Sequence, residues 1–287
     1  MPNISPMSSI LNLLKLELES MARSGQNFIT LSDQSVEFLK KTSLEKMSTP
    51  ILPIDIPDSS PRAEESPQSA YPENALKLIS EGDKSFKYNW LREKILNCPI
   101  CRQHVRLGKK IVVGVGNLDA EIFFCGEAPG ADEEIAGEPF VGRAGQLLTK
   151  IIAAMGLSRS DVYIGNIMNW RPEMESAVGN RPPTREEMHF CLPYLEAQIE
   201  VVQPKVIVAL GATAVNGLLG YDSSRLMKNI RGKWFQFHGL PLMVTFHPSY
   251  LLRNSTIAAK RTVWEDMLAV MEKVSMPISE KQRNFFL

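Results

Sequence analysis

The sequence predicts an α/β fold, a three-layer α/β/α sandwich with a short, mainly parallel central sheet. Apolar segments of strand length alternate with longer segments of helical spacing, a pattern typical of parallel sheets covered on both faces. The predicted strands are residues 111–113, 120–125, 162–166, 206–210 and 242–246. The predicted helices are residues 145–155, 184–201, 212–219 and 257–274. A capping box, Thr184-Arg-Glu-Glu187, follows two prolines and marks the start of the second helix.

The chain is expected to have three parts. Residues 1–47 form an N-terminal extension with a short amphipathic helix, whose apolar stripe suits a protein partner. Residues 48–74 are rich in Pro, Ser, Asp and Glu and predict a disordered linker. Residues 75–287 form the catalytic domain.

Composition limits the classes of protein to consider. The 287 residues are 44% hydrophobic, carry no net formal charge and include no apolar run of membrane-spanning length. The chain does not begin with a secretory signal pattern, so we expect a cytoplasmic monomer with no membrane partner. Residues 81–287 carry a net charge of only +3, so affinity for phosphate would need a local basic patch.

The loop after the strand at 120–125 is the best candidate for a functional site. It contains Gly126-Glu-Ala-Pro-Gly130 and continues through Pro139 to Gln146 into a helix. Glycine and proline allow a sharp turn at the carboxyl end of a strand, where open α/β sheets bind ligands. Glu127 and Phe140 place an acid and a flat ring in this loop, which suggests a flat substrate.

Five motifs, in the same order, resemble the uracil-DNA glycosylase superfamily, and most closely its family-four, iron–sulfur branch. The resemblance covers roughly residues 95–272. The motifs are Gly126-Glu-Ala-Pro-Gly130, Pro139-Phe-Val-Gly-Arg-Ala-Gly145, Val162-Tyr-Ile-Gly-Asn166, Pro204-Lys-Val-Ile-Val-Ala-Leu-Gly-Ala-Thr213 and His247-Pro-Ser-Tyr-Leu-Leu-Arg253. The resemblance implies an enzyme that flips uracil out of DNA and hydrolyses its N-glycosidic bond, leaving an abasic site in base excision repair.

The resemblance also implies a role for each site residue. Phe140 would stack on the flipped base, beside Gly126 and Ala128, and the Asn166 amide would pair with uracil O4 and N3. His247 would donate a hydrogen bond to uracil O2 as negative charge builds there. Glu127 would orient water or stabilise the cationic sugar.

The segment after His247 is expected to contact DNA. We interpret residues 248–253 as a loop with exposed apolar side chains. By resemblance, Leu251 or Leu252 would wedge into the gap left by the flipped base, with Ser249 and Arg253 also contacting DNA. The alternative is a helix start whose leucines belong to the core.

The cysteines depart from the family pattern. Cys98, Cys101 and Cys191 match three ligands of the family's [4Fe–4S] cluster, but Trp170 stands where the fourth thiolate should be. Three alternatives stay open: an altered iron–sulfur cluster, a zinc site completed by a nearby histidine, or no metal with Trp170 filling the space. The candidate histidines are His104 and His189. Cys125 is expected to be a small core residue.

Two other functions are compatible with the same fold. One is a glycosylase of altered base specificity, since Gly130, Asp132 and Glu133 should line the side of the pocket that meets a thymine methyl group. The other is a non-catalytic DNA-binding or repair-complex module, in which the altered cysteine set marks lost activity.

Overall fold

The computed structural model describes residues 82–173 and 180–287. These residues belong to one compact unit, Ser66–Leu287. The predicted N-terminal helix and the predicted linker at 48–74 lie outside the described residues. No helix in the described ranges is long and apolar enough to span a bilayer.

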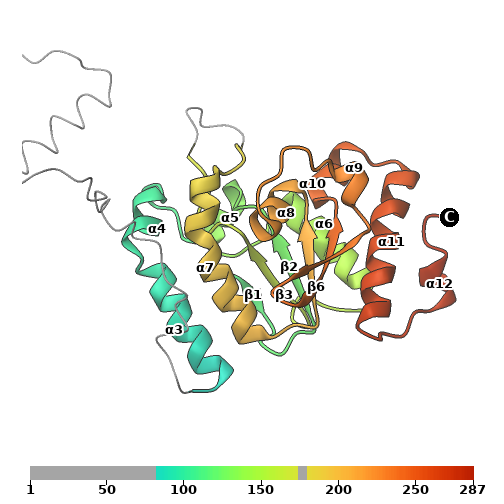
Figure 1. The fold of residues 1–287 in the computed structure, drawn as a ribbon, viewed down its shortest axis with the longest axis horizontal. Helices are drawn as coiled ribbons and strands as arrows, with labels where there is room; N and C mark the ends of the chain where they lie inside the picture. Colours follow the sequence, from blue (N-terminus) through green and yellow to red (C-terminus); the bar gives the residue numbers. More distant parts are fainter. Residues whose placement is uncertain (1–81, 174–179) are drawn as a thin grey trace, which may run out of the picture. The chain divides into compact units, whose positions relative to one another are not determined.

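A six-stranded sheet forms the centre of the unit (Figure 1). Its strands lie in the order β1-β3-β2-β4-β6-β5. The four inner strands are parallel, and the strand at each edge is antiparallel to its neighbour. The strands are β1 (Val115–Gly116), β2 (Ile122–Gly126), β3 (Tyr163–Asn166), β4 (Val206–Leu210), β5 (Trp234–Phe237) and β6 (Leu240–Thr245).

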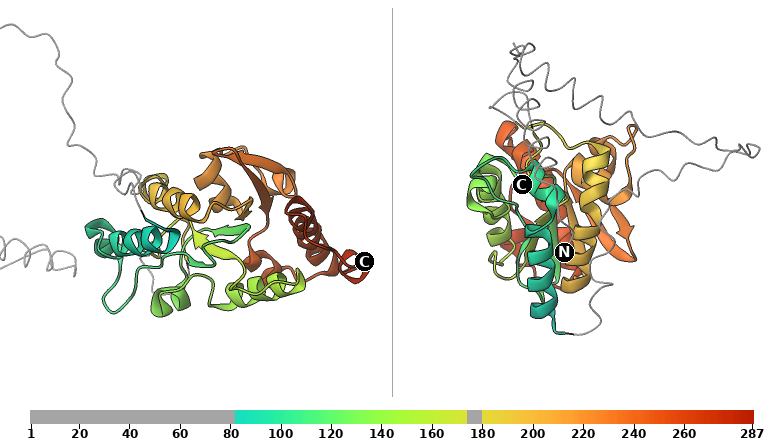
Figure 2. Two further views of the ribbon diagram at one scale, coloured as in Figure 1. Left: turned by 90° about the horizontal axis from the view of Figure 1, so that it is seen from below. Right: turned by 90° about the vertical axis from the view of Figure 1, so that its left-hand side faces the viewer.

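Helices cover both faces of this sheet (Figure 2). The helices are α3 (Lys84–Leu96), α4 (Pro99–His104), α5 (Ala131–Ala136), α6 (Arg143–Ala154), α7 (Arg185–Val202), α8 (Ala212–Leu219), α9 (Met227–Ile230), α10 (Pro248–Arg253), α11 (Ile257–Lys273) and α12 (Glu280–Arg283). One apolar cluster packs α3, α7 and α8 against the sheet, and a second packs α6 and α11 against its other face. The three-layer α/β/α prediction is therefore confirmed.

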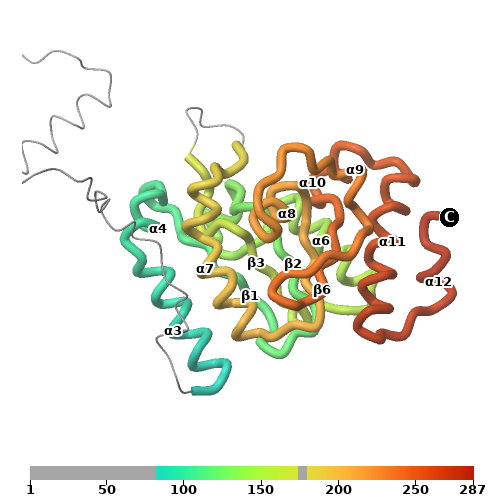
Figure 3. Tube along the Cα trace, in the orientation of Figure 1, coloured from blue at the N-terminus to red at the C-terminus, as the bar shows by residue number. Residues whose placement is uncertain are grey.

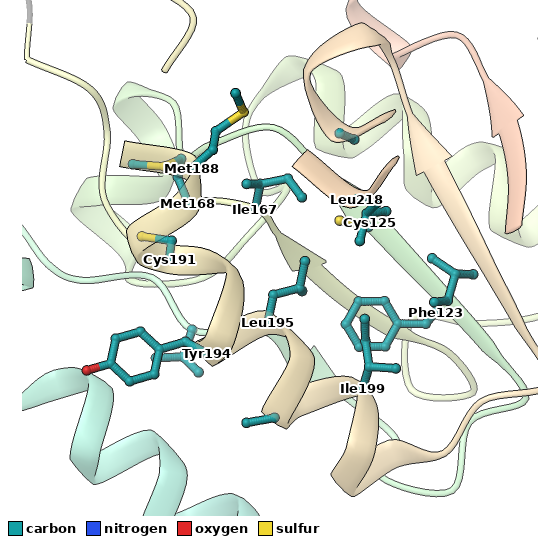
Figure 4. Close-up of a cluster of buried hydrophobic side chains, with 14 of the residues drawn as sticks. Phe123, Cys125, Ile167, Met168, Met188, Cys191, Tyr194, Leu195, Ile199 and Leu218 are labelled. Carbon is teal, nitrogen blue, oxygen red and sulfur yellow. The ribbon is translucent and has the colours of Figure 1, made fainter. Parts of the chain in front are cut away.

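Alternate residues of the central strands supply the two clusters. In β2, Phe123 and Cys125 face α7, while Ile122 and Phe124 face the α6 side. Figure 4 shows the first of these faces, with Leu195 of α7 among the side chains that cover it. All five residues of β2 are buried, as expected for a strand covered on both sides.

The order of the strands determines where a ligand can bind. The chain leaves β2 through α6 to reach β3, and then crosses by α7 to β4 on the opposite side of β2. Such a reversal opens a crevice at the carboxyl ends of the strands, because the two connections leave in opposite directions. Figure 3 follows this path along the Cα trace.

The structure corrects three details of the predicted elements. Residues 111–113 are buried but form no strand: Val112 exchanges hydrogen bonds with Asn169 after β3, and β1 begins only at Val115. The sequence interpretation missed edge strand β5, a segment of only four residues in which Gln236 interrupts the aromatic side chains and the burial varies from residue to residue. Residues 248–253 form helix α10 rather than a loop, which agrees with the alternative of a helix start.

Candidate active site

A cleft of about 780 Å³ opens at the carboxyl ends of the four parallel strands. A residue at or just after the end of each of these strands lines the cleft. Glu127 follows β2, Asn166 ends β3, Gly211 follows β4 and His247 follows β6. The predicted residues Ala128 and Phe140 also line the cleft, so motifs that are far apart in sequence meet at one site.

Asn166 brings an unpaired acceptor to the cleft. Its side chain is only 6% exposed, and its Oδ1 atom has no hydrogen-bond partner. A buried oxygen without a partner costs about 1–3 kcal/mol, so a ligand in the cleft that donates a hydrogen bond to Oδ1 would remove this cost. Gly126 makes room for this arrangement, because a Cβ atom there would lie 2.4 Å from both Asn166 Oδ1 and the Phe140 ring.

Phe140 presents its ring to the cleft from an unusual backbone conformation. Its φ of 55° lies in the left-handed region, which disfavours residues other than glycine. Arg159 holds the main chain there by donating to the Pro139 and Phe140 carbonyl oxygens at 2.8 and 3.0 Å. The ring centroid lies 5.6 Å from that of His247, so the two rings border the same space.

Glu133 also holds the loop that carries Phe140. Its carboxylate accepts the backbone N–H groups of Gly130, Val141 and Gly142 at 3.1, 3.0 and 2.9 Å. A carboxylate that accepts three N–H groups is held firmly, and it joins the start of α5 to the Phe140 loop. Glu133 therefore positions the ring rather than only lining the cleft.

His247 is a neutral imidazole whose protonated nitrogen can be assigned. Its Nδ1 atom accepts the backbone N–H of Ser249 at 3.2 Å, so Nδ1 carries no hydrogen and the proton lies on Nε2. Burial, with a smaller effect of the Arg253 charge, lowers the pKa of His247 to about 4. At neutral pH the side chain is therefore an uncharged N–H donor.

Glu127 lies after β2 in a partly buried position at the edge of the cleft. Burial raises the pKa of Glu127 above its usual range, and a hydrogen bond with Thr213 partly offsets this effect. Thr213 belongs to the fourth family motif, and it adds a polar group on the β4 side of the cleft.

The four residues expected to contact DNA separate into different environments on α10. Leu251 is buried in a small apolar cluster with Ala259 and Val263, so of the two wedge candidates only Leu252, at 40% exposed, is accessible. Arg253 is exposed and lines the cleft. Ser249 also lines the cleft, and its Oγ lies 2.9 Å from His247 Nδ1.

The three family-matching cysteines gather on the side of the sheet covered by α3 and α7. Cys98 begins α4, Cys101 lies within it and Cys191 is on α7, and all three are buried. Burial raises the pKa of the Cys101 thiol, and the neighbouring sulfur atoms of Cys191 and Cys98 raise it further. The thiols are therefore close together.

Trp170, which stands in the sequence where the fourth thiolate is expected, packs against His104 of α4 and Phe190 of α7. Its indole is 1% exposed, and it stacks on the His104 ring with the centroids 4.8 Å apart and the planes 7° from parallel. Among the residues that the structure describes, no group of three or more His, Cys, Asp or Glu side chains is arranged to hold a metal ion. The residues present therefore do not fit a cluster held by four thiolates.

Cys125 is fully buried in β2, as expected for a core residue.

Sequence reasoning missed Arg159 and the pairing of Arg171 with Glu134. Arg171 is buried and binds Glu134 at 2.9 Å, beside the cleft. Glu133 had a local signal, since it stands three residues after Gly130 at the capping-box position of α5. Arg159 had none, because its partners lie about twenty residues earlier in the chain.

A flat ring, an unpaired amide oxygen and a neutral imidazole donor define a pocket for a planar group that can form hydrogen bonds. The sequence profile of the uracil DNA glycosylase superfamily matches residues 113–268. The chain belongs to this superfamily, and its similarity is to the type-4 branch.

Relatives from three organisms support this assignment. A type-4 uracil-DNA glycosylase of Thermotoga maritima is 44% identical over 176 residues, which are 61% of this chain and 88% of the relative. The type-4 enzyme of Pyrobaculum aerophilum is 39% identical, over 58% of this chain and 85% of its own. That of Saccharolobus solfataricus is 37% identical, over 64% and 85%.

Proposed function

We propose that this protein is a uracil-DNA glycosylase that hydrolyses the N-glycosidic bond of uracil in DNA and leaves an abasic site. The observation that carries the proposal is the unpaired Oδ1 of Asn166 in a cleft bordered by the Phe140 ring and the neutral His247 imidazole. Relatives that carry this activity by name match the same part of the chain.

The base is recognised by stacking and by the Asn166 amide. The uracil ring stacks on Phe140, its N3–H donates to Asn166 Oδ1, and its O4 accepts from Asn166 Nδ2. Cytosine presents a donor at position 4 and an acceptor at N3, which would leave both amide groups unpaired in a buried site. Discrimination against an analogue that leaves buried polar groups unpaired can reach about 10⁴-fold.

Bond cleavage uses His247 and Glu127. As the bond between C1′ and N1 breaks, its electron pair moves onto the departing uracil, and the Nε2–H of His247 donates to uracil O2. A neutral donor suits this task because it stabilises the anion without first being protonated. Glu127 orients the water that adds to C1′ and accepts a proton from it. Gly126 and Ala128 form the wall beside the base.

The contact with DNA rests on α10. Leu252 enters the space left by the flipped base, because it is the exposed leucine of the pair. Arg253, exposed at the rim of the cleft, meets a phosphate.

The cysteines have a structural role in this proposal. Cys98, Cys101 and Cys191 join the α4 segment to α7 through buried side chains, and Trp170 fills the remaining space. The chemistry described above needs no redox centre.

Abasic-site formation on oligonucleotides with a single uracil tests the proposed function. The intact protein should cleave, whereas Asn166→Ala and His247→Ala should each lose roughly 10²–10³-fold in rate. Two exposed residues of the same types provide matched controls, Asn284→Ala and His238→Ala. An intact protein that binds such DNA but yields no abasic site would indicate a non-catalytic binding module instead.

A further inference from the structure

A second groove, of about 710 Å³, lies outside the active-site cleft. Its walls come from α3, from the segment after α4 and from the end of α5. Five cationic side chains line it, from Arg92, Arg102, Arg106, Lys109 and Lys110. The only carboxylate among its lining residues is Glu138, so the groove is strongly basic.

The active-site cleft lacks such an excess of positive charge. Its three arginines are matched by three carboxylates among its lining residues, Glu127, Asp132 and Glu133. The whole chain also has no net formal charge. Because affinity for DNA depends largely on neutralising phosphates, the cleft alone is poorly equipped to hold a DNA strand. The basic groove can supply the missing attraction.

Two of the five cations are available to bind an anion. Three serve the fold: Arg106 binds Glu134 at 2.7 Å, Lys110 donates to the Ala136 carbonyl and Arg102 donates to the Leu96 carbonyl. The ion pair of Arg92 with its neighbour Glu93, at 3.3 Å, is solvent-exposed and therefore weak. Within residues 82–173 and 180–287, the Lys109 side chain forms no hydrogen bond or ion pair.

The groove is close to the active-site cleft. The first residues of α5 line the cleft, whereas its last residue, Ala136, lines the groove. Six helical residues span about 9 Å, so a bound strand would reach the groove within a few nucleotides of the cleft. One carboxylate oxygen of Glu134 binds both Arg106 of the groove and Arg171 of the cleft, and this holds the two walls together.

We propose that this groove binds the phosphodiester backbone of the DNA strand that flanks the target base, with Arg92 and Lys109 as the phosphate ligands. The inference rests on the proposed function, because it assumes that DNA occupies the neighbouring cleft. The exposed Leu107, between two of these cations, can contact the sugars of the same strand.

Binding of a single-stranded, uracil-containing oligonucleotide at several salt concentrations tests the proposal. The double variant Arg92→Gln/Lys109→Gln should bind roughly tenfold more weakly at low salt. The slope of log K against log salt should become about 1.4 smaller in magnitude, since each lost phosphate contact removes about 0.7. The control is Lys273→Gln/Lys281→Gln, which removes the same charge from α11 and α12 at the opposite end of the unit and should bind as the intact protein does (Figure 1).

Oligonucleotide length separates the groove from the cleft. A strand that extends only about one nucleotide either side of uracil should not reach the groove, so the double variant should bind and cleave it like the intact protein. An unchanged slope on the long strand, or an equal loss on both lengths, would overturn the proposal. Failure of the proposed function would give a different result, because the intact protein would form no abasic site. The difference in salt slope between the double variant and the intact protein on the long strand would still show whether the groove binds DNA.

Discussion

At the scale of single residues, the protonation state of His247 makes a prediction about pH. Ionisation of an ordinary histidine would change the activity near pH 6.5, but the pKa of His247 is lowered to about 4 by burial. Catalysis that depends on the neutral imidazole should therefore persist as the pH falls through 6.5. Loss at lower pH should come as Glu127, whose pKa is raised by burial, and then His247 become protonated.

The profile of kcat/KM against pH on a uracil-containing oligonucleotide measures this directly. Glu127→Gln should lower the rate and remove the first acidic transition. A single acidic transition near pH 6.5 that disappears in His247→Gln would contradict the assignment of a neutral donor.

Glu133 should act on catalysis through the Phe140 loop that it holds. Glu133→Ala removes an acceptor shared by three backbone N–H groups, so Phe140 should lose its fixed position. We expect kcat/KM to fall at least tenfold, because a displaced ring stacks less well on the base and so stabilises the transition state less. The loss of the α5 capping interaction should also cost about 1 kcal/mol of stability. Glu121→Gln, at an exposed surface ion pair, is the control and should change neither quantity appreciably.

At the scale of elements, the segment after β3 should decide whether the cysteine cluster holds iron. Trp170→Cys restores a thiol at the position where the family's fourth ligand is expected, on the segment that packs against His104 of α4 and Phe190 of α7. When this variant is purified without oxygen, it should contain iron and acid-labile sulfide and absorb visible light. The intact protein should show neither, because the Trp170 indole fills the space. Near-stoichiometric iron and sulfide in the intact protein would contradict this account.

The sequence was most informative about elements that are long or buried on both sides. Strand β4 and helix α8 have the predicted bounds. The strand is a continuous apolar run, and a single glycine separates it from the helix. Edge strand β5 and the short helix α10 could not be recognised in this way, since their residues face both solvent and core. Which leucine of α10 is exposed depends on how α10 packs against α11, and this is a tertiary property.

The site was predicted to the extent that its residues follow parallel strands. Asn166 and His247 end or follow strands, so the sheet alone brings them to one edge. Of the two residues that hold the Phe140 loop, Glu133 had a capping-box signal, whereas Arg159 had none because its partners lie about twenty residues earlier, on the other side of α6. The neutral state of His247 also depends on burial, which its local sequence does not specify.

At the scale of the whole molecule, the catalytic unit should fold without the first part of the chain. The compact unit begins at Ser66 and contains both large apolar clusters. Deletion of residues 1–65 should leave the urea midpoint and the rate of abasic-site formation unchanged. A fall in midpoint would show that the N-terminal extension contributes to the stability of the catalytic unit.

The unpaired oxygen of Asn166 costs the folded protein stability, although the same oxygen is needed to recognise the base. In the absence of substrate, an apolar residue of similar size at this position would avoid the cost of a buried oxygen without a donor. Engineering that selects only for resistance to heat would therefore tend to replace this amide, and would produce a more robust protein that no longer recognises its base. Stability screens on this chain should hold position 166 constant.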